Sequence, residues 1–333
     1  MRHSIFRHPQ DRLPTAIVVA TALLTIPVYL MVDNPWVLLA YWALLLLPRG
    51  AMGAWNHHHQ HCATFRATSL NRALELCYAM QTGMSTDVWA LHHVLGHHQN
   101  YLDQTKDESR WRRRDGTQMG LVEYVFSVAL TSYWRAYKVG RRHPKKGRAF
   151  LSYGLLTLVL LVASIAYRPV PGLLVFVLPM LTTLLWTVWA TYDHHCGLPT
   201  DDPWRASYNM ESRVYNLITC NLGYHTAHHR WPGVHWSELP ALHASVRHKI
   251  PANLLGSWHG IGRRPGASAA SETAVATAPE TEVETGETTQ PSSGHVAELG
   301  SAGQGAAIRY PHPPGGRALA RDAGSESRLA PPN

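Results

Sequence analysis

The sequence predicts an all-α integral membrane protein, with four transmembrane helices in two hairpins, interfacial helices, and a cytosolic cap that carries clustered histidines. Three observations support this fold class: long uncharged apolar segments, basic residues that flank them, and histidines gathered near their ends. A helix of about 20 apolar residues is long enough to cross a bilayer. The apolar residues are concentrated before position 190, so we expect the membrane helices in that part of the chain.

Four segments are long and apolar enough to span the membrane. Asp33-Asn34-Pro35 separates the first two, and Arg168-Pro169 separates the last two. Because these breaks are so short, each pair is predicted to form an antiparallel hairpin. The predicted spans cover about residues 14–32, 36–55, 149–167 and 170–192.

Basic residues set the orientation of the hairpins. Arg2, Arg7 and Arg12 precede the first span, and six Lys or Arg residues lie between positions 138 and 148, before the third span. Loops rich in Lys and Arg stay in the cytosol, so both hairpins should begin and end there. Because the basic residues lie beside apolar segments, we expect the net charge of +8 to reflect a membrane partner and no nucleic acid.

The segment 118–140 is nearly long enough to span and carries one acidic residue, Glu123, in that stretch. If it crossed the membrane, the histidines at 225–229 would lie on the opposite side from those at 57–98. We therefore predict an amphipathic helix at the membrane interface, with Trp134 and Tyr137 near the lipid headgroups.

Histidine is the most unusual feature of the composition. The chain has 22 histidines, and 13 of them fall in four clusters at 57–61, 92–98, 194–195 and 225–229. His57 and His61 stand four residues apart, so they would project from one face of a helix. Composition and spacing together indicate a metal site.

The later clusters complete this set. His93 and His97 repeat the four-residue spacing, and His98 adds a neighbour. A pair at 194–195 follows the last predicted span, so one of its histidines can join the same site. The third cluster has spacings of three and four residues and contains His225, His228 and His229.

Eight or nine neutral imidazoles are more than one metal ion can hold, so two ions are implied. Zinc has no redox chemistry, so a nitrogen-rich site at a membrane face fits a pair of non-haem iron ions that activate O2 better. An acyl chain could reach this site from the bilayer. The sequence therefore predicts O2-dependent oxidation of an unactivated C–H bond in a lipid-like substrate.

The three larger clusters resemble the HxxxH, HxxHH-like and HxxHH boxes of membrane fatty acid desaturases and related hydroxylases, over about residues 36–245. The segment 221–229 (NLGYHTAHH), with Pro232 and Trp236, is similar to the third box of the sphingolipid-desaturase and carotenoid-ketolase branches. The segment 191–195 (TYDHH) resembles the family segment that ends in an extra ligand. The middle box has three residues between His93 and His97 where two are common, and both spacings occur in the family.

The resemblance implies desaturation of an acyl chain, with a hydroxylase or ketolase of the same scaffold as the alternative. It also implies that Asn221 holds a metal-bound water molecule. The metal ligands it implies are His57, His61, His93, His97, His98, His195, His225, His228 and His229. A histidine-rich metal transporter is a further alternative, but it would place its ligands in the middle of the bilayer.

The sequence contains no ferredoxin cysteine pattern and no flavin motif. Electrons are therefore expected from a separate protein similar to ferredoxin or cytochrome b5. The basic segment 138–148 could receive an acidic donor, or it could lie against anionic lipid. The four cysteines form no CxxC pair, and we expect them to be reduced.

The remaining candidates are expected to support the site or to lie elsewhere. The histidines predicted to point away from the metals are His58, His59, His92 and His194, and those predicted at the surface or the membrane interface are His235, His243, His248 and His259. The carboxylates that could anchor ligand histidines are Asp87, Asp103, Asp107, Asp193 and Glu211. The aromatic residues that could line a substrate tunnel, or instead belong to the membrane belt or the core, are Trp186, Trp189 and Tyr192.

Two regions are predicted along the chain: a membrane-bound catalytic domain at 1–259 and a disordered low-complexity tail at 260–333. The tail contains a single aromatic residue, Tyr310, and too few apolar residues to offset its conformational entropy. Its segment 312–316 (HPPGG) is interpreted as a chance match to the haem-ligand loop of cytochrome b5 domains.

Overall fold

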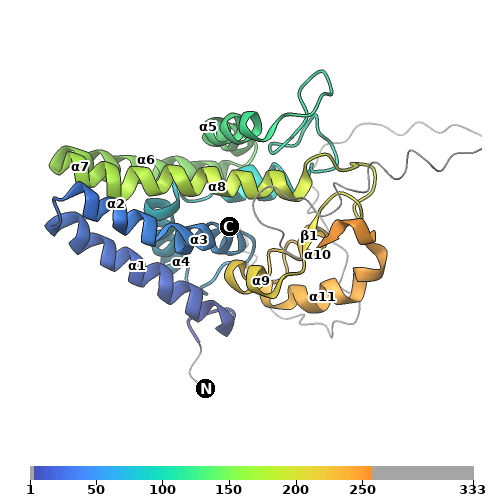
Figure 1. Cartoon of the computed structure of the whole chain (residues 1–333), viewed down its shortest axis with the longest axis horizontal. Helices are drawn as coiled ribbons and strands as arrows, with labels where there is room; N and C mark the ends of the chain where they lie inside the picture. Colours follow the sequence, from blue (N-terminus) through green and yellow to red (C-terminus); the bar gives the residue numbers. More distant parts are fainter. Residues whose placement is uncertain (1–3, 257–333) are drawn as a thin grey trace, which may run out of the picture.

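The computed structural model describes residues 4–256 and shows long helices lying side by side, with a small cap at one end (Figure 1). The long part contains α1 (Arg12–Met31), α2 (Pro35–Leu44), α3 (Leu46–His61), α4 (Thr68–Thr82), η2 (Ala90–Leu95), α5 (Leu121–Gly140), α6 (Pro144–Tyr167), α7 (Pro169–Gly172), η3 (Leu173–Val177) and α8 (Leu178–His195). A short turn of 3-10 helix, η1 (Pro9–Asp11), precedes α1.

Three helical segments are long and apolar enough to cross a membrane: Pro9–Met31, Pro144–Tyr167 and Pro169–His195. The pair Pro35–Leu44 and Leu46–His61 meets the same requirement together and makes a fourth span if it crosses as one. The predicted helical membrane class is therefore confirmed, with three candidate spans, or four if the bent pair crosses as one. The second span differs from the prediction because it is bent by 50° at Leu45.

The bend has a cause in the sequence. Pro48 lies in the first turn of α3, where it provides no backbone N–H and its ring would clash with the carbonyl of residue 44 in a continuous helix. Helix α2 therefore ends at Leu44, and α3 starts in a new direction. Helix α3 continues to His61, six residues beyond the predicted end of the span, and so carries the first histidine cluster.

The two hairpins are joined at their tips. The Arg168 side chain binds the Asp33 carboxylate and the backbone carbonyl of Tyr29. The Tyr29 hydroxyl donates to the Ser164 carbonyl at 2.8 Å. These contacts lie in the two short breaks predicted between the spans or just before them, and they fix one hairpin against the other.

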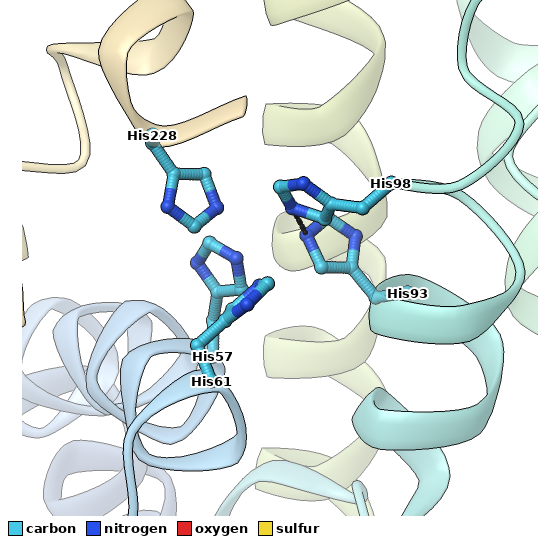
Figure 2. Close-up of side chains that lie close together, drawn as sticks. All are labelled: His57, His61, His93, His98 and His228. Atoms are coloured by element: carbon cyan, nitrogen blue, oxygen red, sulfur yellow. Dashed lines mark hydrogen bonds between the residues drawn. The ribbon is translucent and has the colours of Figure 1, made fainter. Parts of the chain in front are cut away.

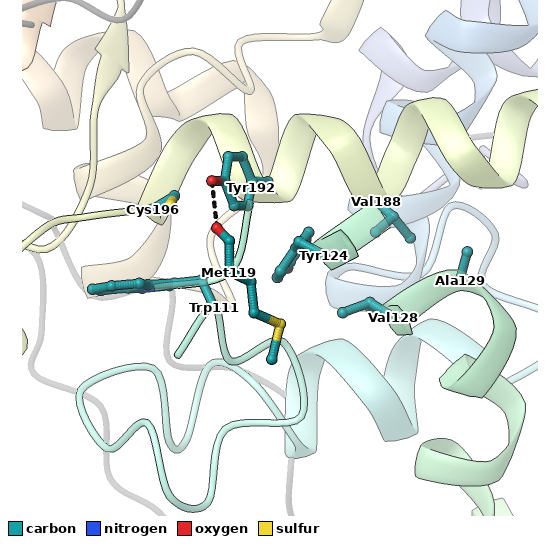
Figure 3. Packing of buried hydrophobic residues seen from close by; sticks show 8 residues of the cluster. All are labelled: Trp111, Met119, Tyr124, Val128, Ala129, Val188, Tyr192 and Cys196. Carbon is teal, nitrogen blue, oxygen red and sulfur yellow. Dashed lines mark hydrogen bonds between the residues drawn. The ribbon is translucent and has the colours of Figure 1, made fainter. Parts of the chain in front are cut away.

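Helix α5 does not meet the length and hydropathy requirement for a span. It packs on α8 through a core that includes Tyr124, Val128 and Val188 (Figure 3). Its Trp134 is 60 % exposed, on the side away from this core, which agrees with the interfacial helix predicted here. Tyr192 belongs to the core and donates to the Met119 carbonyl at 2.8 Å, so of its predicted roles the core role is correct.

The cap follows α8. It contains β1 (Asn209–Met210), α9 (Arg213–Thr219), α10 (His225–Arg230), η4 (Trp236–Glu238), α11 (Leu239–Val246), η5 (Arg247–Lys249), η6 (Ala252–Leu254) and β2 (Leu255–Gly256). The two short strands pair in parallel, with Asn209 opposite Leu255. This pairing closes the cap on itself.

Two histidines of the cap were wrongly predicted at the surface. His235 and His243 are each 3 % exposed, because each finds a carboxylate: His235 lies 3.0 Å from Asp11, and His243 lies 2.9 Å from Glu211. His248 is exposed as predicted. His259 and the predicted tail lie outside the described residues.

Glycine at position 83 ends α4 in a left-handed conformation with φ of 72°. A Cβ there would lie 2.8 Å from the Met180 carbonyl oxygen of α8. We expect Gly83→Ala to lower the free energy of unfolding by more than the roughly 1–2 kcal/mol of left-handed strain alone. Thermal unfolding of the purified protein would measure this.

Gly116 offers the matched control, because it has φ of 84° and a Cβ added there would meet nothing within 4 Å. Gly116→Ala should show the conformational cost without the clash. Equal losses for the two variants would contradict a close α4–α8 contact at Gly83.

Candidate metal centre

The first histidine cluster lies in the last turn of α3. His57 and His61 are one turn apart and point to the same side, as their spacing predicts (Figure 2). Their neighbours point elsewhere: His58 lies 3.2 Å from the Thr219 carbonyl, and His59 contacts Thr64 and Glu75.

The second cluster differs from the predicted four-residue pair. Helix η2 is a π-helix, and the backbone N–H of His98 donates to the carbonyl of His93 at 2.8 Å. A π-turn aligns residues five apart, so Nε2 of His98 lies 3.0 Å from Nε2 of His93. His97 is consequently turned toward a different set of histidines.

Five histidines form the first group (Figure 2). One nitrogen of each ring lies within 4.8 Å of the others, and four of the five rings are buried. They come from α3, from the segment around η2 and from α10. The members are His57, His61, His93, His98 and His228.

A second group lies beside the first. His97, His195 and His229 place one nitrogen each within 4.8 Å of one another, and all three are buried. His225 belongs with them, because its Nε2 lies 3.0 Å from that of His195 and 3.1 Å from that of His229. The structure thus brings all nine predicted ligand histidines into two adjacent groups.

The donor geometry fits metal ions. Two nitrogens that bind one ion at about 2.1 Å and at right angles are about 3.0 Å apart. The facing Nε2 atoms of His97 and His195 are 3.2 Å apart, close to this value. In the first group, Nε2 of His57, His61 and His228 is buried with no hydrogen-bond partner among the described residues, so each is free to bind an ion.

Burial also sets the charge of these rings. It lowers the pKa of His93, His98 and His228 well below 6.5, and the neighbouring histidines lower each pKa further. These three imidazoles are therefore neutral at neutral pH. Neutral imidazole is the form that binds metals.

Two ligand candidates have their outer nitrogen fixed. Nδ1 of His97 lies 2.8 Å from Asp107, and Nδ1 of His195 lies 2.9 Å from the Ala206 carbonyl. Such contacts set the tautomer and the direction of the ring, so that Nε2 faces the ion. Asp107 is one of the five carboxylates predicted for this role.

The other predicted carboxylates lie elsewhere. Asp103 pairs with Lys106 at the surface, and Glu211 binds Arg247 as well as the buried His243. Asp193 lines the cavity described below. Asp87 belongs to a network of charged residues.

That network connects the first two histidine clusters. Glu75 contacts His59 at 3.3 Å and Arg72 at 2.6 Å, and Arg72 reaches Asp87 at 3.0 Å. Lys146 at the start of α6 also binds Asp87. Glu75 was not among the carboxylates predicted from the sequence, although its position on α4 three residues after Arg72 is a signal of an ion pair along one helix face.

Histidines 92 and 194 are buried but belong to neither group. His194 lies 3.2 Å from the Tyr208 carbonyl and 3.2 Å from the Tyr215 hydroxyl. Asn221 has φ of 65°, and its side-chain amide donates to the Trp236 carbonyl at 3.2 Å. This hydrogen bond fixes Asn221 just before α10.

A cavity of about 280 Å³ opens between α3, α8 and α9. Histidines of both groups line its inner wall, among them His57 of α3. Leu47 also lines the cavity and lies about 15 Å from His57 along the axis of α3. Leu47 is 55 % exposed and Val214 of α9 is 58 % exposed, so the cavity lining includes apolar side chains at the protein surface. Its shape and lining suit an aliphatic chain.

Two tryptophans predicted as tunnel or core residues, Trp186 and Trp189, line this cavity. A Cβ at Gly50 would lie 3.4 Å from the Trp186 ring, and a Cβ at Gly53 would lie 2.6 Å from the Thr187 hydroxyl. The two glycines therefore let α3 approach α8 closely. Trp186 lies flat against the α3 backbone as a result.

The neutral state of the buried imidazoles predicts a pH dependence. In the unfolded chain these histidines take up protons near pH 6.5, whereas in the metal-free fold burial keeps the pKa of His93, His98, His228 and others far lower. The contribution of these neutral buried histidines to the free energy of unfolding is therefore fully present above pH 6.5. It is lost as the pH falls below that value.

We expect the unfolding temperature of the metal-free protein to drop between about pH 7.5 and about pH 5.5. The double variant His98→Ala/His228→Ala should show a shallower slope, because two of the groups are gone. A slope unchanged by the double substitution would contradict burial of neutral imidazoles.

Comparison with known proteins agrees with this geometry. The family model described as fatty acid desaturase matches residues 34–260. The chain is 24% identical over 259 residues to the protein named omega-3 fatty acid desaturase, endoplasmic reticulum, of Vigna radiata var. radiata, and the alignment covers 66% of this chain and 63% of that protein. No solved structure matches the chain significantly. Because the matched region covers more than half of the sequence and contains all four histidine clusters, the chain belongs to the fatty acid desaturase family.

Proposed function

We propose that the chain is an O2-dependent oxidoreductase with two non-haem iron ions that introduces a double bond into the acyl chain of a lipid. One observation carries this proposal: nine imidazoles, eight of them buried, form two adjacent groups at the inner end of an apolar cavity. Imidazole nitrogens suit iron, and the cavity suits an aliphatic substrate.

The iron ions would supply the redox chemistry with O2 that breaks an unactivated C–H bond. In desaturation, a CH2–CH2 unit, O2, two electrons and two protons give a CH=CH unit and two water molecules. In hydroxylation, the alternative for this scaffold, one C–H bond becomes C–OH and one water molecule forms. Both reactions consume the same electrons, so the product distinguishes them.

The chain's own residues have distinct parts in this proposal. The five histidines of the first group would hold one ion and the four of the second group the other. Asp107 would keep Nε2 of His97 directed at its ion. We propose that Asn221, fixed by its bond to Trp236, holds a water molecule beside the ions.

The substrate would enter between Leu47 and Val214, the exposed side chains of the cavity. Apolar walls would exclude water from the reacting carbon. The position of Trp186, flat against Gly50, would limit where the acyl chain can lie and so which carbons reach the ions.

Electrons would come from a separate one-electron carrier similar to ferredoxin or cytochrome b5. The four cysteines are free thiols with no spacing suited to an iron–sulfur cluster. We place the metal centre on the cytosolic side, because the cap lies at the end of α8 and the basic segment 138–148 favours that side.

Removing one ligand candidate tests the proposal. We expect His228→Ala to abolish activity and to lower the iron content from about two ions per chain to about one or fewer. His58→Ala is the matched control, because His58 is buried on the same helix as His57 but bonds to the Thr219 carbonyl. The control should retain most of its iron.

The readouts are iron content of the purified protein and mass spectrometry of lipids from a host that expresses each variant. Loss of two hydrogens in a lipid would establish a desaturase, and gain of one oxygen a hydroxylase. Full iron content and activity in His228→Ala would refute the site. An iron-free wild type would instead favour metal transport.

The cavity gives a second test. Trp186→Ala should leave the iron content unchanged and shift the product profile in chain length or double-bond position. The reason is that the cavity would become wider beside Gly50 when the indole ring is removed. Trp134→Ala, on the exposed face of α5, is the control. An unchanged product profile in an active Trp186→Ala protein would show that the substrate does not reach this wall.

A further inference from the structure

A second apolar groove, of about 480 Å³, lies on another side of the helix bundle. It is bounded by α6, by Tyr133 of α5 and by Met180 and Leu181 around α8, and α5 lies beside α6 and α8 (Figure 1). The groove shares no lining residue with the cavity that reaches the histidines. It therefore needs an explanation apart from the reaction.

A buried hydroxyl, that of Ser85, lies next to the groove behind Gly154. Gly154 of α6 lines the groove, and a Cβ there would lie 3.7 Å from the Ser85 hydroxyl. Ser85 is 3 % exposed, and its hydroxyl has no hydrogen-bond partner among the described residues. A buried hydroxyl without a partner is costly. It would be satisfied by an acceptor that occupies the groove beside Gly154.

Leucines form the open edge of the groove. Leu151, Leu155 and Leu158 are 53 %, 61 % and 54 % exposed, and they follow one another along α6 at helical spacing. Helix α6 is a candidate membrane span. These side chains would therefore face acyl chains of the bilayer.

Cations lie above this edge. Arg148 precedes Leu151 by three residues and Leu155 by seven, so it stands on the same side of α6. It is exposed, as are Arg141, Arg142 and Lys145. None of these four makes an ion pair with a carboxylate in the described part of the chain. Nearby, Glu108 is already paired with Lys138.

We propose that this groove binds one anionic phospholipid. Its phosphate would lie on Arg148 and Lys145, an ester carbonyl would accept a hydrogen bond from Ser85, and one acyl chain would occupy the groove. The rise along α6 from Arg148 to Gly154 is about 9 Å, which matches the order phosphate, ester, acyl chain from the membrane surface inward.

Among partners for the basic segment, this arrangement favours a lipid over an acidic protein. A folded protein could contact the cations, but it could not place an acceptor on Ser85 or fill a groove that faces the bilayer. A lipid satisfies all three features together. The proposal concerns a structural site and does not depend on the reaction at the histidines.

Native mass spectrometry of the purified full chain, with phosphatidylglycerol or phosphatidylcholine added, tests the proposal. We expect one phosphatidylglycerol per chain to be retained in preference to phosphatidylcholine. Gly154→Leu, which fills the groove, and Arg148→Gln, which removes a phosphate ligand, should each weaken retention by about tenfold or more. The controls Ala163→Leu, on the opposite face of α6, and Arg114→Gln, an exposed cation in another loop, should retain the lipid.

Each outcome is decisive. Equal retention of both lipids, or wild-type retention by Arg148→Gln and Gly154→Leu, would show only non-specific lipid contact and overturn the proposal. If Arg148→Gln retained the lipid but slowed reduction by an acidic electron carrier, the cations would belong to a protein-docking surface. Arg148→Gln lies at the surface, so the test does not depend on how well Gly154→Leu folds.

Discussion

Nine imidazoles packed into two adjacent groups, eight of them buried, are the constraint on which the rest of the structure depends. Their ring nitrogens face one another, and several have no protein partner among the described residues. Buried polar groups without partners are unfavourable, so the apo arrangement is held in place by what surrounds it. Metal ions bound at the centre would convert this cost into stabilisation, because binding to the folded state adds its free energy to folding.

Charged contacts between distant segments hold the histidine clusters in place. Arg72 connects Glu75, behind the first cluster, to Asp87, just before the second. On the other side, Asp11 accepts from Trp236 at 2.8 Å and lies 3.0 Å from His235, which fastens the cap to the start of α1. Asp107 completes the set by fixing His97. Carboxylates thus brace the first two histidine clusters, through Glu75 and Asp107, and the segment that follows the third cluster, through Asp11.

Much of this could be predicted from the sequence, because spans and histidine clusters are local signals. The hairpin breaks, the α5 segment and the grouping of histidines all follow from apolar runs, flanking charge and spacing. The burial of His235 and His243 could not be predicted. His235 depends on Asp11, which is more than 200 residues away in the sequence, and His243 depends on Glu211, in another segment of the cap. The split of His93 and His97 between the two groups was also missed, because their spacing suits an ordinary α-helical turn.

The π-turn at η2 also explains how two spacings of the middle box can serve one architecture. A π-turn holds one more residue than an α-turn while the helix axis continues. The residue that this chain has beyond the commoner spacing is therefore absorbed in the backbone, and His98 still meets His93. A change in sequence length is thus taken up by a local change in helical winding, and a comparison of middle boxes should align ring positions in space and not residue counts.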